Sequence, residues 1–118
     1  IKKGIGGVKE SIEYIKKGFS IALMIDQRVS EGELINFFNK PALTTTLPAQ
    51  LALKFNLSIV PVFIEREKNG IYKIRFYDEI DSSTYSNKLD LSVKLNSLLE
   101  MFIKKNPNEW IWTHNRWK

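Results

Sequence analysis

Two short apolar runs, Ser20–Ile25 and Ser58–Ile64, most constrain how this chain can fold. Neither run shows a polar residue at every second position, so both faces of each strand are expected to be covered, as in a parallel sheet. Pro61 has no N–H to donate, so we expect it at a strand end, at an edge or at a bulge. The runs therefore predict two buried strands.

A helix is expected between the two strands, starting near Thr46, with Pro48 in its first turn, and ending at Asn56. Its buried side consists of apolar residues at helical spacing, namely Leu47, Leu51, Ala52 and Phe55. Strand, helix and strand in this order predict a βαβ unit with a right-handed crossover.

The flanking segments predict further elements. Apolar residues spaced three and four apart predict a helix from Val8 that ends at Gly18. After the turn at 68–70, the run Ile71–Tyr77 predicts a hairpin strand. Its expected core face carries Tyr72, Ile74 and Phe76, opposite Lys73 and Arg75. Residues 78–88 are polar and predict a loop.

Two helices are expected after that loop. Asp90 is a suitable cap for the first, whose apolar stripe is Leu91, Leu95, Leu98, Leu99 and Phe102. Asn106 and Glu109 have the spacing of a capping box for a short last helix. The predicted fold class is therefore α/β: a βαβ unit plus an antiparallel strand with flanking helices, in residues 1–118.

Composition narrows the possible partners. The 18 basic and 13 acidic residues give a net charge of +5, which favours nucleic acid, phosphorylated lipid, an acidic membrane or an acidic carrier protein. A solvated lysine-rich surface explains the same charge. With no cysteine and only His114, the chain offers neither a Cys-ligated zinc site nor a multi-histidine metal site, and no apolar run is long enough to span a bilayer. Because it starts with Ile1, we expect a piece of a longer protein.

The predicted connection from Asp26 to Thr45 is unusually long for an α/β unit. It leaves the carboxyl end of a parallel strand, where open α/β sheets bind ligands. Asp26 and Gln27 stand at its root, and the adjacent Phe37 and Phe38 could wall an apolar channel. The alternative is structural, with one phenylalanine filling the core and Asp26 capping a turn.

The last segment holds three tryptophans. If it is helical, Trp110, His114 and Trp117 share one face. Docking on the core, contact with a membrane interface and stacking on bases all remain open, and His114 is either a packing or a catalytic residue. The chain has no phosphate-binding loop and no Gly-x-Ser-x-Gly motif, and no acidic residue follows its single histidine.

Several segments of the chain, taken in sequence order, resemble segments of the late acyltransferases of lipid A biosynthesis (the lauroyl and myristoyl acyltransferases). The similarity runs from about Gly18 to Lys118. It rests on Ile25-Asp26-Gln27, on Phe37-Phe38-Asn39-Lys40-Pro41-Ala42 with Thr44 to Thr46, on Leu51-Ala52-Leu53, and on Ile59-Val60-Pro61-Val62-Phe63. The most specific part is the closing motif Pro-x-x-Trp-x-Trp-x-His-x-Arg-Trp-Lys, from Pro107 to Lys118.

The resemblance implies the carboxyl-terminal half of a glycerolipid-acyltransferase-like fold. Such an enzyme works at the cytoplasmic face of the bacterial inner membrane in lipopolysaccharide biosynthesis. It transfers a fatty acyl chain from the thioester of acyl carrier protein to a phosphorylated lipid A precursor, without a further cofactor. The family's catalytic His/acid pair and its membrane anchor are expected upstream, so we assign no catalytic residue here and expect this chain alone to be inactive.

The resemblance also implies supporting roles in substrate binding. These residues are Asp26 and Gln27 near the pocket, Phe37 and Phe38 beside the acyl chain, and Arg66 and Arg116 facing phosphates. A structural ion pair is the alternative for Arg116. Two alternatives remain open. One is a catalytically dead homologue of these enzymes. The other is a nucleic-acid-binding module, which the positive charge, Lys73, Arg75 and the tryptophans would suit.

Overall fold

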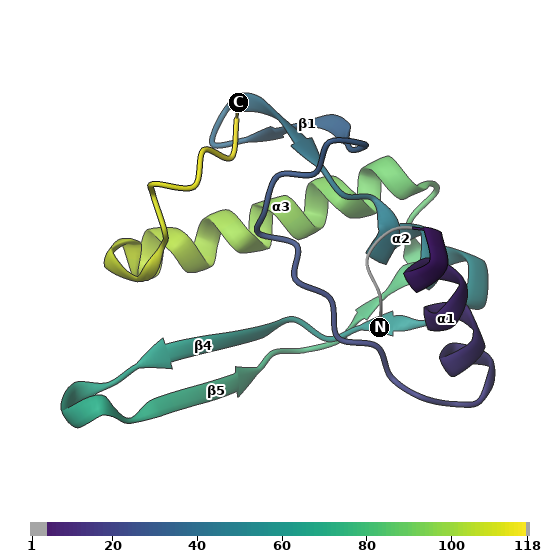
Figure 1. Cartoon of the computed structure of the whole chain (residues 1–118), viewed down its shortest axis with the longest axis horizontal. Coiled ribbons are helices and arrows are strands. Elements are labelled where there is room, and N and C mark those ends of the chain that lie inside the picture. The colour runs from purple at the N-terminus through teal and green to yellow at the C-terminus, as the bar shows by residue number, and fades with distance from the viewer. Residues whose placement is uncertain (1–4, 118) are drawn as a thin grey trace.

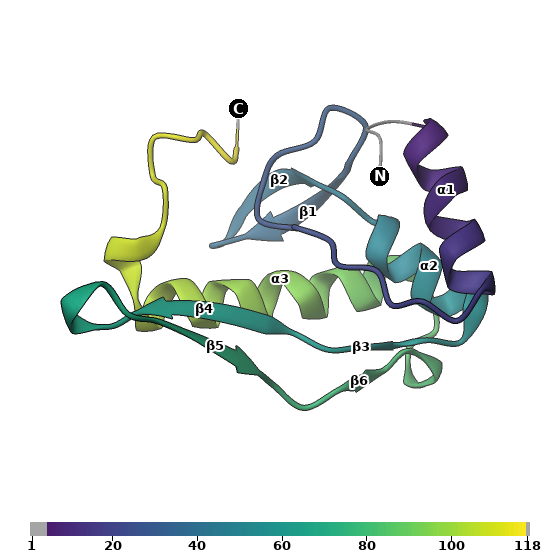
Figure 2. The same ribbon diagram turned by 60° about the horizontal axis from the view of Figure 1, so that its bottom comes forward.

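The computed structural model describes residues 5–117 and shows a mixed α/β chain (Figures 1 and 2). The three α-helices are α1 (Ile5–Lys16), α2 (Leu47–Phe55) and α3 (Lys88–Lys105). The strands are β1 (Glu33–Phe37), β2 (Lys40–Thr44), β3 (Ser58–Ile59), β4 (Val62–Arg66), β5 (Tyr72–Phe76) and β6 (Ile80–Asp81). The α/β class predicted from the sequence is confirmed.

The described strands form three separate two-stranded antiparallel sheets, which pair β1 with β2, β3 with β6, and β4 with β5. The β1–β2 hairpin lies on one side of α3 and the β4–β5 hairpin on the other, as both views show (Figures 1 and 2). Helix α3 is therefore the middle layer of this part of the molecule.

Local signals define the ends of α1 and α2. Gly18 adopts a φ of 84°, and the amides of Gly18 and Phe19 bond to the carbonyls of Ile15 and Tyr14, which is a Schellman cap. Asn56 ends α2 in the left-handed region with a φ of 51°. Thr46, where this helix was expected to start, is the N-cap residue of α2, although its side chain makes no capping hydrogen bond.

The strand predicted at Ser20–Ile25 does not form. This segment is coil, and no backbone–backbone hydrogen bond involves residues 20–31. A strand needs a neighbour to bond, and none of the described strands pairs with it. Of the predicted βαβ unit, the structure therefore contains the helix and the second strand, which is divided into β3 and β4 at Val60 and Pro61.

Three further boundaries differ from the prediction. The expected long loop 26–45 contains the β1–β2 hairpin, and the expected polar loop 78–88 contains β6 and a short 3-10 helix, Ser82–Thr84. Helix α3 begins at Lys88, because the Asn87 side chain accepts hydrogen bonds from the amides of Leu89 and Asp90. Asp90 is therefore inside the first turn and is not the cap.

The β4–β5 hairpin exposes the face that was predicted to be core. Tyr72, Ile74 and Phe76 are 63%, 57% and 73% exposed. The opposite face packs on α3, where Phe63 stacks on Phe102 with ring centroids 4.9 Å apart. On this same inward face, Glu65 bonds to Arg75 and Lys105. The alternation was recognised correctly, but its burial was assigned to the wrong side.

The segment after α3 is not the predicted helix. A 3-10 turn, Pro107–Glu109, is followed by turns up to residue 117, so the tryptophans do not share a helical face. Trp110 and Trp117 nevertheless pack on a core cluster built from Phe37, Ala42 and Ile103. Docking on the core, one of the three alternatives for these residues, therefore holds for both of them. Lys118, the end of the closing motif, lies outside the described residues.

Candidate functional site

An apolar groove of about 820 Å³ lies between the coil after α1, helices α2 and α3, and strands β3 and β4. Aliphatic side chains from each of these elements line it, including Ile21, Leu51, Leu57, Ile59, Leu95 and Leu98. Ser20 and Ser58 are the polar residues of this lining, and no charged side chain takes part. The volume and the apolar walls are typical of a site for an apolar ligand.

Asp26 and Gln27 directly follow, along the chain, the coil that lines this groove. The coil residues that line the groove extend to Ile25, and Asp26 is the next residue in the sequence. Asp26 is half-buried and Gln27 is exposed. The segment before this pair is coil and not the expected strand, and the part of the pair in substrate binding stays a prediction.

The two phenylalanines lie elsewhere. Phe37 is 0% exposed, and its ring lies 5.6 Å from that of Trp117 and 4.9 Å from that of Phe38. Neither Phe37 nor Phe38 lines the groove, and their hairpin is on the far side of α3 from β4–β5 (Figure 1). The expectation that both rings wall the same apolar channel as the Asp26 loop is therefore wrong for the groove seen here. Phe37 fills the core, which was the structural alternative.

Side chains from α3 and the closing segment hold the turn that carries these rings. The turn is made by Phe38 and Asn39, with φ angles of 51° and 61°. The Phe38 amide donates to Glu100 Oε1 at 2.8 Å, and Trp117 Nε1 donates to the Phe37 carbonyl at 2.9 Å. Asn96 Nδ2 donates to the Asn36 carbonyl at 3.1 Å. These hydrogen bonds between side chains and the hairpin backbone hold the β1–β2 hairpin against α3.

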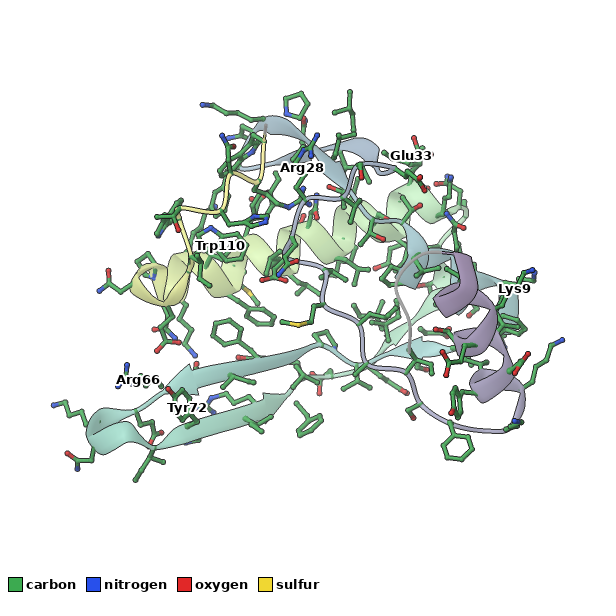
Figure 3. All side chains as sticks on the ribbon, in the orientation of Figure 1. Lys9, Arg28, Glu33, Arg66, Tyr72 and Trp110 are labelled. Atoms are coloured by element: carbon green, nitrogen blue, oxygen red, sulfur yellow. The ribbon has the colours of Figure 1, made fainter. Side chains whose placement is uncertain are left out.

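The two candidate arginines are in different places. Arg116 is 0% exposed and donates to the carbonyl of Leu43 and to Thr44 Oγ1, with its guanidinium 5.3 Å from the Phe37 ring centre. Burial lowers the pKa of Arg116, and the charge of Asp26 opposes this effect. Arg66 is exposed at the outer end of the β4–β5 hairpin (Figure 3). The structure therefore does not bring the two guanidinium groups together.

Sequence reasoning missed Asn96 and Glu100 as partners of the hairpin. Asn96 is 2% exposed and bonds both to Asn36 and, at 3.3 Å, to Thr44 Oγ1. The available signal was a polar residue beside Leu95 in the apolar stripe of α3. A buried polar side chain requires a partner, so its position predicts a contact with a backbone or polar group.

The basic residues of β5 are already engaged by acidic neighbours. Arg75 Nε lies 2.8 Å from Glu65 Oε2, and Lys73 Nζ lies 3.6 Å from Glu67 Oε1. Hydrogen bonds from Lys105 and Arg75 lower the pKa of Glu65 to about 2. This strand therefore does not present a free row of positive charge, as the nucleic-acid alternative requires.

Two kinds of feature are absent from residues 5–117. No group of three or more His, Cys, Asp or Glu side chains there is arranged to hold a metal ion. In the same region, no helix has the length and apolar character needed to cross a bilayer. His114, the single histidine, is exposed and lies in a turn.

Comparison with known families identifies the class of protein. The family described as bacterial lipid A biosynthesis acyltransferase matches residues 2–118, which is nearly the whole chain. The chain belongs to this family of acyltransferases. Compared with individual curated proteins, it has no significant match.

Proposed function

We propose that this chain is the carboxyl-terminal part of an enzyme that transfers a fatty acyl chain from acyl carrier protein to a phosphorylated lipid A precursor. Family membership supports acyl transfer in lipid A biosynthesis for the parent enzyme, by which we mean the full-length protein containing this chain. Within the proposal, the thioester of acyl carrier protein is the donor and no further cofactor is needed. The reaction takes place at the cytoplasmic face of the inner membrane.

The groove is the observation that carries this function. Its walls are aliphatic and uncharged, and its volume of about 820 Å³ lies within the usual range for small-molecule sites. Each buried methylene of an acyl chain contributes about 0.8 kcal/mol, so a groove of this kind favours a fatty acyl chain over a polar ligand. We therefore assign the acyl chain to the groove, with Asp26 and Gln27 at its end.

The reacting groups belong, in this proposal, to the part of the parent enzyme upstream of Ile1. General-base catalysis of attack on a thioester needs a base near the acceptor hydroxyl, as a His oriented by a carboxylate provides. His114 lies in the exposed closing segment, and no carboxylate of residues 5–117 bonds to its side chain, so it does not suit this role. The role of Arg66 toward substrate phosphates remains a proposal, which its exposure permits.

The outer face of the β4–β5 hairpin is the surface that we assign to the upstream part. This face carries Val62, Ile64, Tyr72, Ile74 and Phe76, which are between 48% and 73% exposed. It adjoins the groove, because Val62 and Phe76 belong to both. The coil before Asp26 lines the same groove. It has the composition of a buried strand but forms no backbone hydrogen bonds with a neighbouring strand, and a strand of the upstream part would supply them.

A substitution that narrows the groove tests the assignment of the acyl chain. Leu98 on α3 lines the groove, whereas Met101 on the same helix is 49% exposed and does not line it. In the parent enzyme, Leu98→Trp should displace about two methylenes, or about 1.6 kcal/mol, and lower kcat/KM for the natural acyl donor roughly 15-fold. Met101→Trp is the matched control and should leave kcat/KM unchanged. Equal effects of the two substitutions would show that the acyl chain lies elsewhere.

A further inference from the structure

Arg116 combines complete burial with an unused donor. Its side chain is 0% exposed, and its two terminal nitrogens bond to the Leu43 carbonyl and to Thr44 Oγ1. Its Nε is also buried and has no hydrogen-bond partner within the described part of the chain. Neutral oxygens compensate a buried guanidinium incompletely, because a buried cation is stabilised best by a carboxylate that also satisfies its remaining donors.

Asp26 is the carboxylate whose charge acts on Arg116. It is half-buried, and its charge partly opposes the lowering of the Arg116 pKa by burial. Within residues 5–117, the Asp26 carboxylate forms no ion pair within 4.0 Å and no hydrogen bond. The surrounding coil, residues 20–31, has no backbone–backbone hydrogen bonds, so a small displacement of Asp26 breaks none.

We propose that Asp26 and Arg116 form an ion pair in which the carboxylate accepts a hydrogen bond from the free, buried Nε–H. Arg116 already holds Leu43 and Thr44 of β2, so this pair joins the end of the groove to the β1–β2 hairpin. Both are positioning residues, because they fix two segments and neither needs to touch a substrate. The pair also accounts for the presence of an aspartate at the root of the coil and an arginine near the end of the chain, 90 positions apart.

The Nε–H resonance of Arg116 reports on this ion pair directly. In the ¹⁵N-labelled chain, we expect a resolved Arg116 Nε–H signal that exchanges slowly with water. Asp26→Asn keeps the shape and removes the charge, and should accelerate that exchange about tenfold, the size expected for losing a charge-assisted hydrogen bond. The amides of β1 and β2 should also exchange faster. Glu31→Gln is the matched control, since Glu31 is an exposed carboxylate on the same coil, and should change neither.

Two results would overturn the proposal. The first is an Arg116 Nε–H whose chemical shift and exchange rate are the same in Asp26→Asn as in the unmodified chain. The second is faster exchange that is equal across α2, the β4–β5 hairpin and the β1–β2 hairpin, since that pattern indicates general destabilisation. An effect confined to Arg116 and the β1–β2 hairpin supports the ion pair.

Discussion

Replacing Phe37 by alanine should remove much of the stability of this chain. The ring is 0% exposed and lies between Phe38, Trp110 and Trp117, with the Arg116 guanidinium over its face. Removing a fully buried phenylalanine costs about 3–5 kcal/mol, which includes the cavity that it leaves. Since a domain is stabilised by about 5–15 kcal/mol, Phe37→Ala should bring this chain close to unfolding.

The loss in the free energy of unfolding can be measured by urea unfolding, with tryptophan fluorescence as the signal. Trp110 and Trp117 lie against the Phe37 ring, so their fluorescence reports on this part of the core. With a slope of about 1.5 kcal/mol per M, the unfolding midpoint should fall by about 2–3 M urea. Phe76→Ala is the matched control: that ring is 73% exposed, so its removal should change the free energy of unfolding by no more than about 0.5 kcal/mol. Equal losses for both variants, or a loss below about 1 kcal/mol for Phe37→Ala, would refute the reasoning that this ring anchors the hairpin.

Two further expectations concern the β4–β5 hairpin. Bonds from Lys105 and Arg75 lower the pKa of Glu65 from 4.5 to about 2, so their stabilisation should be complete above pH 4.5 and be lost as the pH falls toward 2. Acid unfolding of Glu65→Gln should depend less steeply on pH in this range, and an unchanged profile would contradict the role of Glu65. Ile74→Lys should alter the stability of this chain by no more than about 0.5 kcal/mol, because Ile74 is 57% exposed. In the parent enzyme the same change should abolish folding or activity, whereas Ile74→Val should not; normal activity of Ile74→Lys would show that this face stays uncovered.

The three α-helices could be predicted because their signals are local, whereas the last predicted helix, after α3, does not form. The spacing of Ile12 and Ile15, the left-handed Gly18 after α1 and the left-handed Asn56 after α2 all act within a few residues of the chain. Helical hydrogen bonds are also formed within the segment, so a periodic pattern nearly suffices to define a helix. Local signals also placed the hairpin turn at 68–70 correctly, whereas Ser58–Ile64, expected as one strand, is divided at Val60 and Pro61.

Strands could not be predicted equally well, because a strand depends on its neighbours. Ser20–Ile25 has the composition of a buried strand, yet it lacks a ladder partner among the described residues and is coil. In β5, alternation separates Tyr72 from Lys73 but does not say which face is covered. Here the charged face packs on α3, where Glu65 compensates the basic side chains of Arg75 and Lys105.

The surroundings of the candidate site residues could be predicted only in part. The rule that ligands bind where strands end suggested an apolar site next to Asp26. A groove does reach Ile25 along the chain, but the strand on which the rule depends is coil, and the role of Asp26 stays a prediction. The β1–β2 hairpin was missed because its turn, Phe38-Asn39, contains no glycine, although both residues have positive φ angles. The burial of Arg116 could not be foreseen either, since its partners are a carbonyl and a hydroxyl group, which leave no charge pattern in the sequence.

Acyl transfer measured side by side for the parent enzyme and for residues 1–118 tests the central claim most directly. Both proteins receive a fatty acyl thioester of acyl carrier protein and a phosphorylated lipid A precursor, and acylated product is quantified by mass spectrometry. We expect the parent enzyme to form product and the chain alone to form none, because our proposal assigns the reacting base to the upstream part and the apolar groove to this chain. Turnover by the chain alone would contradict the account, and so would a parent enzyme that forms no product.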